Sequence, residues 1–235
     1  MSSPGVHNQI IKSVAKEILQ PFGFIQRGRS RLWIADNGWW LVLVEFQPSS
    51  WSRGTYLNVG AKFLWSGDNV FSFDFSFGVS ARLGKFCEFV DGERFAVEVR
   101  RLAELASNEA QRLRQEFATM EGTADSLATR VLSSPWGLYH AAAAAILAGR
   151  TEKGRAFLDE LQRIQGDTKS LYHVAVSPGK VMPEWRKSFY DAAGSLSSVS
   201  NEPAKVADAL ANCVRHSRKL LKLPEWRGQL GSGNL

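Results

Sequence analysis

Side chains that move protons, attack a substrate or hold a metal are scattered along this chain of 235 residues. Its four histidines, His7, His140, His173 and His216, form no His-x-x-x-His or His-x-His pair and have no cysteine or carboxylate at ligand spacing. A glycine-rich phosphate loop, a Gly-x-Ser-x-Gly elbow and a kinase-like set of motifs are also missing. We therefore expect no metal and no cofactor, and we predict that the protein is not an enzyme.

Glu45 is the carboxylate whose position most suggests catalysis. It stands near the end of the most apolar run, 39–46, where loss of contact with water would raise its pKa. The structural interpretation, which we favour, is that Glu45 pairs with a nearby arginine at the strand end. We also expect His140, which precedes a run of alanines, to be a packed helix residue rather than a general base.

The stretch QPSSWSRGTYLN combines side chains that are typical of binding surfaces. Its amides flank the loop on two neighbouring strands, where they could bond each other or a ligand. Its tryptophan, arginine and tyrosine are residue types found in the hot spots of protein interfaces. On a structural interpretation, which we favour, the amides satisfy backbone groups and the tryptophan packs on the core. The binding candidates are Gln47, Trp51, Arg53, Tyr56 and Asn58.

Positive charge offers an alternative, because the formal net charge is +6 at pH 7. Such a charge permits attraction to nucleic acid or to acidic proteins. An arginine-rich turn near Trp33 and a basic helix near the C-terminus could bind phosphates. Basic residues at helix C-termini are equally ordinary partners of the helix dipole. The candidates for this nucleic-acid alternative are Arg27, Arg29, Arg31, Arg215, Arg218, Lys219 and Lys222.

The elements that must position these groups begin with a helix over residues 10–19, whose apolar residues recur at helical spacing until Pro21 and Gly23. Strand-like runs follow, separated by short turns such as Asp36–Gly38, which favour an antiparallel meander. In the last run, phenylalanine alternates with serine and aspartate. The predicted strands cover 23–28, 31–36, 39–46, 55–65 and 70–80.

Helical patterns fill the remainder of the chain. A long amphipathic helix over 95–117 can cover the sheet, and Ser134 with Pro135 should begin a helix that ends at Gly149. Two more are expected over 151–166 and from Asn201 to Leu220, the second after a polar connection at 194–203. The predicted fold class is α+β: an antiparallel meander of about five strands, packed by an N-terminal and a long central helix, then a helical half. We assign 1–120 to the α+β region, 121–230 to a helical region packed on it as one compact unit, and 231–235 to a flexible tail.

The N-terminal quarter, about residues 10–65, resembles a bacterial family known as domain of unknown function 4304. The resemblance is carried by Gly23–Phe24 after the first helix, the basic turn Arg27–Arg31, Phe46–Gln47 at a strand end, the Ser-rich loop Ser49–Ser52, and Tyr56, Asn58 and Gly60 on the next strand. It implies this fold, a bacterial cytoplasmic protein, and an accessory role in a toxin-immunity or phage-defence setting. A protein partner is therefore expected, with nucleic acid as the alternative.

The cysteines and the apolar segments of the chain agree with the cytoplasmic location that the resemblance implies. Cys87 and Cys213 belong to no paired-cysteine motif, so we expect buried free thiols. The longest apolar stretch, 141–148, is too short to cross a membrane, and the N-terminus shows no signal-peptide pattern. We expect no membrane partner.

Overall fold

A computed structural model describes residues 5–78, 80–130, 134–175 and 184–230, with only the backbone described for 165–175, 184–188 and 190. The expected tail at 231–235 lies outside these residues. The chain divides into two compact units. The first contains Met1–Phe63 and Val70–Gln115, and the second contains Leu64–Asn69 and Glu116–Leu235. Each unit has its own core.

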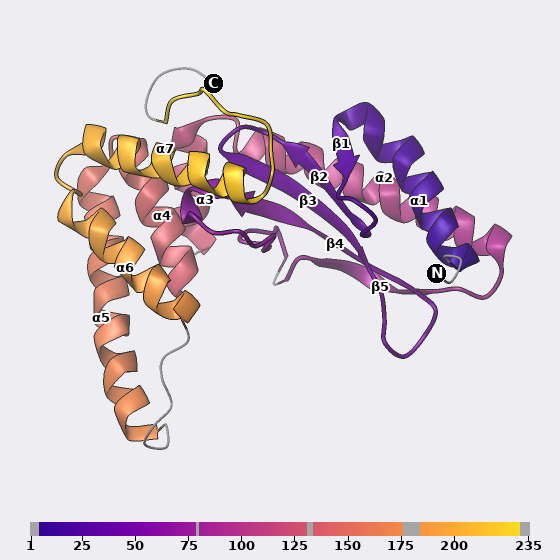
Figure 1. Cartoon of the computed structure of the whole chain (residues 1–235), viewed down its shortest axis with the longest axis horizontal. Helices are drawn as coiled ribbons and strands as arrows, with labels where there is room; N and C mark the ends of the chain where they lie inside the picture. Colours follow the sequence, from indigo (N-terminus) through magenta and orange to yellow (C-terminus); the bar gives the residue numbers. More distant parts are fainter. Residues whose placement is uncertain (1–4, 79, 131–133, 176–183, 231–235) are drawn as a thin grey trace. The chain divides into compact units, whose positions relative to one another are not determined.

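The first unit is built on an antiparallel sheet of five strands in the order β1-β2-β3-β4-β5, as the sequence predicted (Figure 1). Asp36–Gly38 makes the expected turn, in which the Gly38 amide donates to Asp36 Oδ1 over 2.9 Å. The longest strands, β3 and β4, pair from Trp40↔Phe63 to Gln47↔Tyr56. The strands are β1 Phe24–Gln26, β2 Leu32–Asp36, β3 Trp40–Gln47, β4 Gly54–Phe63 and β5 Arg82–Glu88.

Two helices accompany this sheet, α1 (Val6–Leu19) and α2 (Gly92–Glu116), and α2 passes behind the strands in Figure 1. They lie side by side, because Arg100 of α2 forms a 2.8 Å ion pair with Glu17 of α1. Both bury an apolar stripe at helical spacing, which the sequence predicted for each. A short 3-10 helix, Gln20–Phe22, ends α1 as expected, and the next residue, Gly23, has a left-handed conformation.

The prediction of a strand over residues 70–80 is wrong in its position. In the described part of this segment, one isolated bridge joins Phe75 to Ala61, and the fifth strand is Arg82–Glu88 instead. Asp74 explains the irregular course, because its carboxylate accepts from the Phe63 amide over 2.8 Å and lies 3.4 Å from Lys62 Nζ. The alternating pattern predicted a strand with one apolar and one polar face. Instead, Asp74 turns inward and binds Lys62 and the Phe63 amide of β4.

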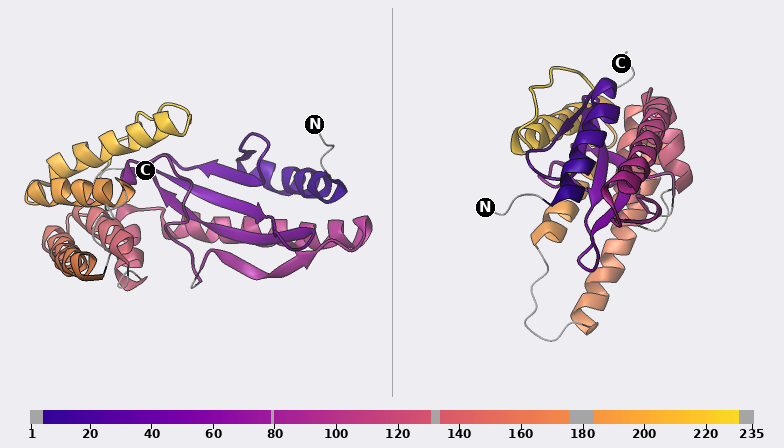
Figure 2. Two further views of the ribbon diagram at one scale, coloured as in Figure 1. Left: turned by 60° about the horizontal axis from the view of Figure 1, so that its bottom comes forward. Right: turned by 90° about the vertical axis from the view of Figure 1, so that its right-hand side faces the viewer.

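The second unit is helical, as predicted, although several boundaries differ. Trp65, in the 3-10 helix Leu64–Ser66, is fully buried and donates from Nε1 to His140 Nδ1 over 2.9 Å. The core also contains the five alanines of α4, all of which are 0–1% exposed. The helices, seen from two further sides in Figure 2, are α3 Met120–Arg130, α4 Pro135–Leu147, α5 Thr151–Ala175, α6 Glu184–Ser198 and α7 Pro203–Leu220.

One helix and two helix boundaries differ from those predicted. No separate helix was predicted for α3, α5 continues through Gly166 to Ala175, and α6 includes the first part of the expected polar connection. By contrast, Ser134 accepts from the Gly137 amide over 3.0 Å, which confirms it as the N-cap of α4. Tertiary context overrides local sequence signals, so a helix can continue through a glycine such as Gly166.

The two cysteines differ from the expectation of full burial. Cys87 and Cys213 are free and half-buried, and burial raises the pKa of both thiols. Among the described helices, none combines the length and apolar character needed to cross a membrane.

A close approach in the first unit gives a stability prediction. A Cβ added at Gly60 would lie 2.4 Å from the carbonyl oxygen of Phe75, so Gly60→Ala must displace the 70–77 segment. We expect a loss of about 1–3 kcal/mol in the free energy of unfolding, measured by urea denaturation. Gly92→Ala is the matched control, because its Cβ would meet Ile10 at an ordinary 3.7 Å. Equal stabilities of the two variants would contradict the close contact.

Candidate functional site

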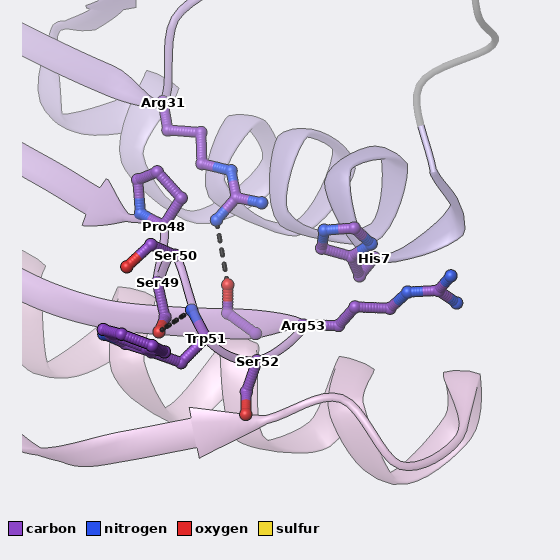
Figure 3. A pocket seen from close by; sticks show the side chains of 9 residues that line it. His7, Arg31, Pro48, Ser49, Ser50, Trp51, Ser52 and Arg53 are labelled. Carbon is purple, nitrogen blue, oxygen red and sulfur yellow. Dashed lines mark hydrogen bonds between the residues drawn. The ribbon is translucent and has the colours of Figure 1, made fainter.

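The β3–β4 hairpin carries the loop that the sequence analysis singled out, and its tip is solvent-exposed. Trp51 is 94% exposed, so the expectation that it packs on the core is wrong. Its amide donates to Ser49 Oγ over 3.1 Å, a local turn that lets the indole project outward (Figure 3). Tryptophan is highly buried on average in folded proteins, so this exposure departs from its usual environment.

Gly54 fixes the path by which the loop rejoins the sheet. Its φ of 147° is a backbone conformation that side chains with a Cβ rarely adopt. A Cβ here would lie 2.1 Å from the carbonyl oxygen of Cys87 on β5. The loop therefore has a close-packed end on β4, while Trp51 at its tip stays free of the core.

Three of the five binding candidates form a polar cluster on one face of the sheet. Asn58 Nδ2 donates to Gln47 Oε1 over 3.0 Å and to Glu45 Oε2 over 2.9 Å. Arg82 of β5 donates to the same Gln47 oxygen over 2.7 Å and places its guanidinium carbon 3.9 Å from the centre of the Tyr56 ring. The partners of the two amides are side chains, so the expectation that they satisfy backbone groups is wrong.

This cluster also settles how Glu45 is bound. The sequence analysis expected an arginine partner, but the bond from Asn58 is the polar contact that the structure shows for its carboxylate. The Gln47 side-chain oxygen receives two donors from within the fold. The amides of Gln47 and Asn58 thus bond each other, which was one of the two possibilities we considered. Because its polar groups bond within the fold, we infer that the cluster supports the hairpin and is not an open recognition surface.

Arg31 lies on the opposite face, because Leu32 is paired with Glu45 and successive residues of a strand alternate. Its guanidinium donates through Nε and Nη2 to Asn8 Oδ1, the former over 2.8 Å. Nη1 donates to the carbonyl oxygen of Gly54 over 2.9 Å and to that of Phe46 over 3.4 Å. Burial lowers the pKa of Arg31, yet a guanidinium stays protonated in proteins. One side chain therefore joins the start of α1 to both ends of the hairpin loop.

Beside this guanidinium lies a hollow of about 280 Å³, which we call the Arg31 hollow (Figure 3). His7, at the start of α1, lines it together with Arg53 from the loop. Burial, with the positive charges of Arg31 and Arg53, lowers the pKa of His7 below its ordinary value of 6.5. The complete lining is His7, Arg31, Pro48, Ser49, Ser50, Trp51, Ser52, Arg53 and Gly54.

The hollow gathers two of the predicted binding residues, Trp51 and Arg53, with two that sequence reasoning did not place there. From the sequence, Arg31 belongs to the nucleic-acid alternative, and His7 is a histidine without a partner at ligand spacing. Arg31 and Asn8 are 23 positions apart, so no local pattern joins them. The closest signal was the Ser-rich loop Ser49–Ser52, whose four residues all line the hollow.

The seven residues proposed for nucleic-acid binding differ in how exposed they are and in what they bind. On the β1–β2 hairpin, Arg27 stacks over the ring of Phe71 at 5.6 Å, Arg29 is exposed, and Arg31 is bound as described. On α7, Arg218 is only 4% exposed and donates to the carbonyl oxygen of Pro224 over 2.8 Å. The prediction that Arg218 is available to bind a nucleic acid is therefore wrong.

Three other basic residues at the end of this helix lie at the surface or near it. Arg215 is exposed and donates to Asn212 Oδ1 over 2.8 Å. Lys219 is exposed as well, and so is Lys222, which follows the helix with a φ of 54°. The basic run of α7 thus divides into a buried structural arginine and a few solvated cations.

Groups suited to catalysis are not gathered elsewhere in the described part of the chain. The described residues contain no cluster of three or more His, Cys, Asp or Glu that could hold a metal ion. His140 is 1% exposed and accepts from Trp65, which confirms its expected role as a packed helix residue. Burial raises the pKa of its neighbour Tyr139, whose hydroxyl donates to the Trp65 carbonyl oxygen over 3.3 Å.

Comparisons with protein-family models, with curated proteins and with solved structures find no match. The resemblance described for residues 10–65 therefore stays a prediction that rests on its sequence pattern.

The electrostatics of the hollow can be tested through His7. Arg53→Gln removes one of the two positive charges that act on this imidazole, so the pKa of His7 should rise. The measurement is an NMR titration of the imidazole carbon and proton shifts. Arg29→Gln is the matched control, because it removes an equal charge from the β1–β2 hairpin outside the hollow. If the pKa of His7 is unchanged in Arg53→Gln, the Arg53 guanidinium does not lie close to the His7 imidazole.

Proposed function

We propose that this protein is a non-enzymatic, cytoplasmic bacterial accessory protein that binds another protein through the Trp51 loop, residues 48–53. The observation that carries the proposal is the 94% exposure of Trp51 at the tip of a hairpin whose base is fixed. The toxin-immunity or phage-defence setting suggested by the resemblance belongs to the same proposal.

Exposure of Trp51 alone would not favour binding. Here, however, the base of the loop that carries Trp51 is held in place by hydrogen bonds. Arg31 bonds to the backbone at Phe46 and Gly54, the two residues that bracket the loop. A loop whose ends are already ordered loses less conformational entropy when a partner binds. Tryptophan and arginine are the residue types most enriched among binding hot spots. Trp51 and Arg53 stand two positions apart on this loop.

The nucleic-acid alternative receives less support from the contacts. Three of its seven residues, Arg31, Arg215 and Arg218, direct their guanidinium groups to acceptors within the fold. Sequence-independent binding of nucleic acid requires several cations that are free to neutralise phosphates. Four exposed cations keep this alternative as an outcome of the experiment: Arg29, Arg215, Lys219 and Lys222.

The test is affinity capture of a partner by the tagged protein from its own host, with and without nuclease, for wild type and Trp51→Ala. A captured protein is then purified and its dissociation constant measured against both. Removal of a hot-spot tryptophan costs about 2 kcal/mol or more, so we expect roughly thirtyfold weaker binding or more. The reason is loss of the apolar area that the partner would cover.

Val97→Ala is the control, because Val97 is an apolar residue of α2 that is 64% exposed. It should bind as wild type does. If Trp51→Ala binds the purified partner with unchanged affinity, the loop is not the recognition site. Recovery of nucleic acid that nuclease removes, insensitive to Trp51→Ala, would replace the proposal with its alternative.

A further inference from the structure

The lining of the Arg31 hollow is unbalanced in charge. Two arginines and one histidine contribute to it, and none of its nine lining residues is acidic. Arg31 makes its bonds to an amide oxygen and to backbone carbonyls, all of them uncharged. For the Arg53 side chain, the structure shows no ion pair among the described residues. A partly buried positive charge without a counter-charge is costly, and an anion would relieve that cost.

Hydrogen-bond donors suited to an anion surround the same hollow. The loop supplies the hydroxyls of Ser49, Ser50 and Ser52, of which Ser49 already accepts from the backbone and so keeps its proton to donate. Helix α1 begins at Val6, and its first turn contains no acidic residue. The positive end of the helix dipole therefore adds to the two arginines at the position of His7.

We propose that the Arg31 hollow binds an oxyanion, either a carboxylate or a phosphate monoester, that is carried by the partner protein. The inference rests on the proposed function, because Trp51 at the rim would contact the surface that presents the anion. Arg53 and the serine hydroxyls would bind the oxygens directly, while Arg31 supplies charge from below and keeps its bonds to Asn8 and Gly54. The ligand is thus an acidic or phosphorylated segment.

His7 gives this site a dependence on pH. The charged groups that act on its imidazole are Arg31 from the β1–β2 hairpin and Arg53 from the loop, and the uncharged ring of Phe89 lies 5.7 Å away. A bound anion would offset both positive charges and stabilise the protonated imidazole. By linkage, binding of the anion and binding of the proton strengthen each other. Affinity should therefore increase as the pH falls through the pKa of His7.

The experiment uses the purified full chain, with inorganic phosphate and acetate as probes at constant ionic strength. NMR follows the His7 imidazole, and each anion should raise its pKa. Arg53→Gln should weaken phosphate binding about tenfold or more, the usual consequence of losing a hydrogen bond to a charged group. Arg29→Gln, with the same loss of charge outside the hollow, should bind phosphate as wild type does. Urea denaturation of each variant confirms that it is folded.

Two peptides of equal length, one of glutamates and one with a phosphoserine, then distinguish the sources of the anion by their dissociation constants. The inference is overturned if neither phosphate nor acetate changes the pKa of His7, or if Arg29→Gln and Arg53→Gln weaken binding equally. These outcomes are separate from the capture experiment. A partner lost in Trp51→Ala without any anion effect would retain the protein-binding role and remove only the oxyanion site.

Discussion

The guanidinium of Arg31 is the contact on which the candidate site depends. Its donors reach Asn8 on the first helix and the carbonyl oxygens of Phe46 and Gly54 on either side of the hairpin loop. A single planar group with five fixed donors can join three backbone segments in this way, which a lysine could not. The same contact places a charge without a carboxylate partner beside the loop. Order in the loop and its positive potential therefore have one physical origin.

The opposite face of the sheet supplies the complementary support. Gln47 and Asn58 bond each other, Arg82 completes the network, and its guanidinium covers Tyr56. With polar groups satisfied on one face and Arg31 on the other, β3 and β4 can project Trp51 into solvent without losing register. Trp51 thereby stays outside the core, although burying its indole would stabilise the fold. We infer that its exposure serves recognition.

Much of the fold could be predicted because the strands from β1 to β4 follow simple apolar patterns and short turns. The segment 70–80 shows the limit of that reasoning, since Asp74 binds Lys62 and the Phe63 amide instead of facing water. For the site, Gln47, Trp51, Arg53, Tyr56 and Asn58 could be proposed from residue types alone. Their division between two faces required strand register, and the contribution of His7 and Arg31 required a contact between distant segments. Whether Trp51 is exposed also depends on tertiary packing, which no local pattern contains.

The most direct test of this account is hydrogen–deuterium exchange of the full chain, alone and bound to its captured partner. Added protection is predicted at residues 48–54 and at the first turn of α1, because the partner would cover the Trp51 loop and the Arg31 hollow together. Amides of α7 should exchange as they do in the free protein. Protection confined to α7, with an unchanged loop, would contradict the central claim and assign recognition to the helical unit.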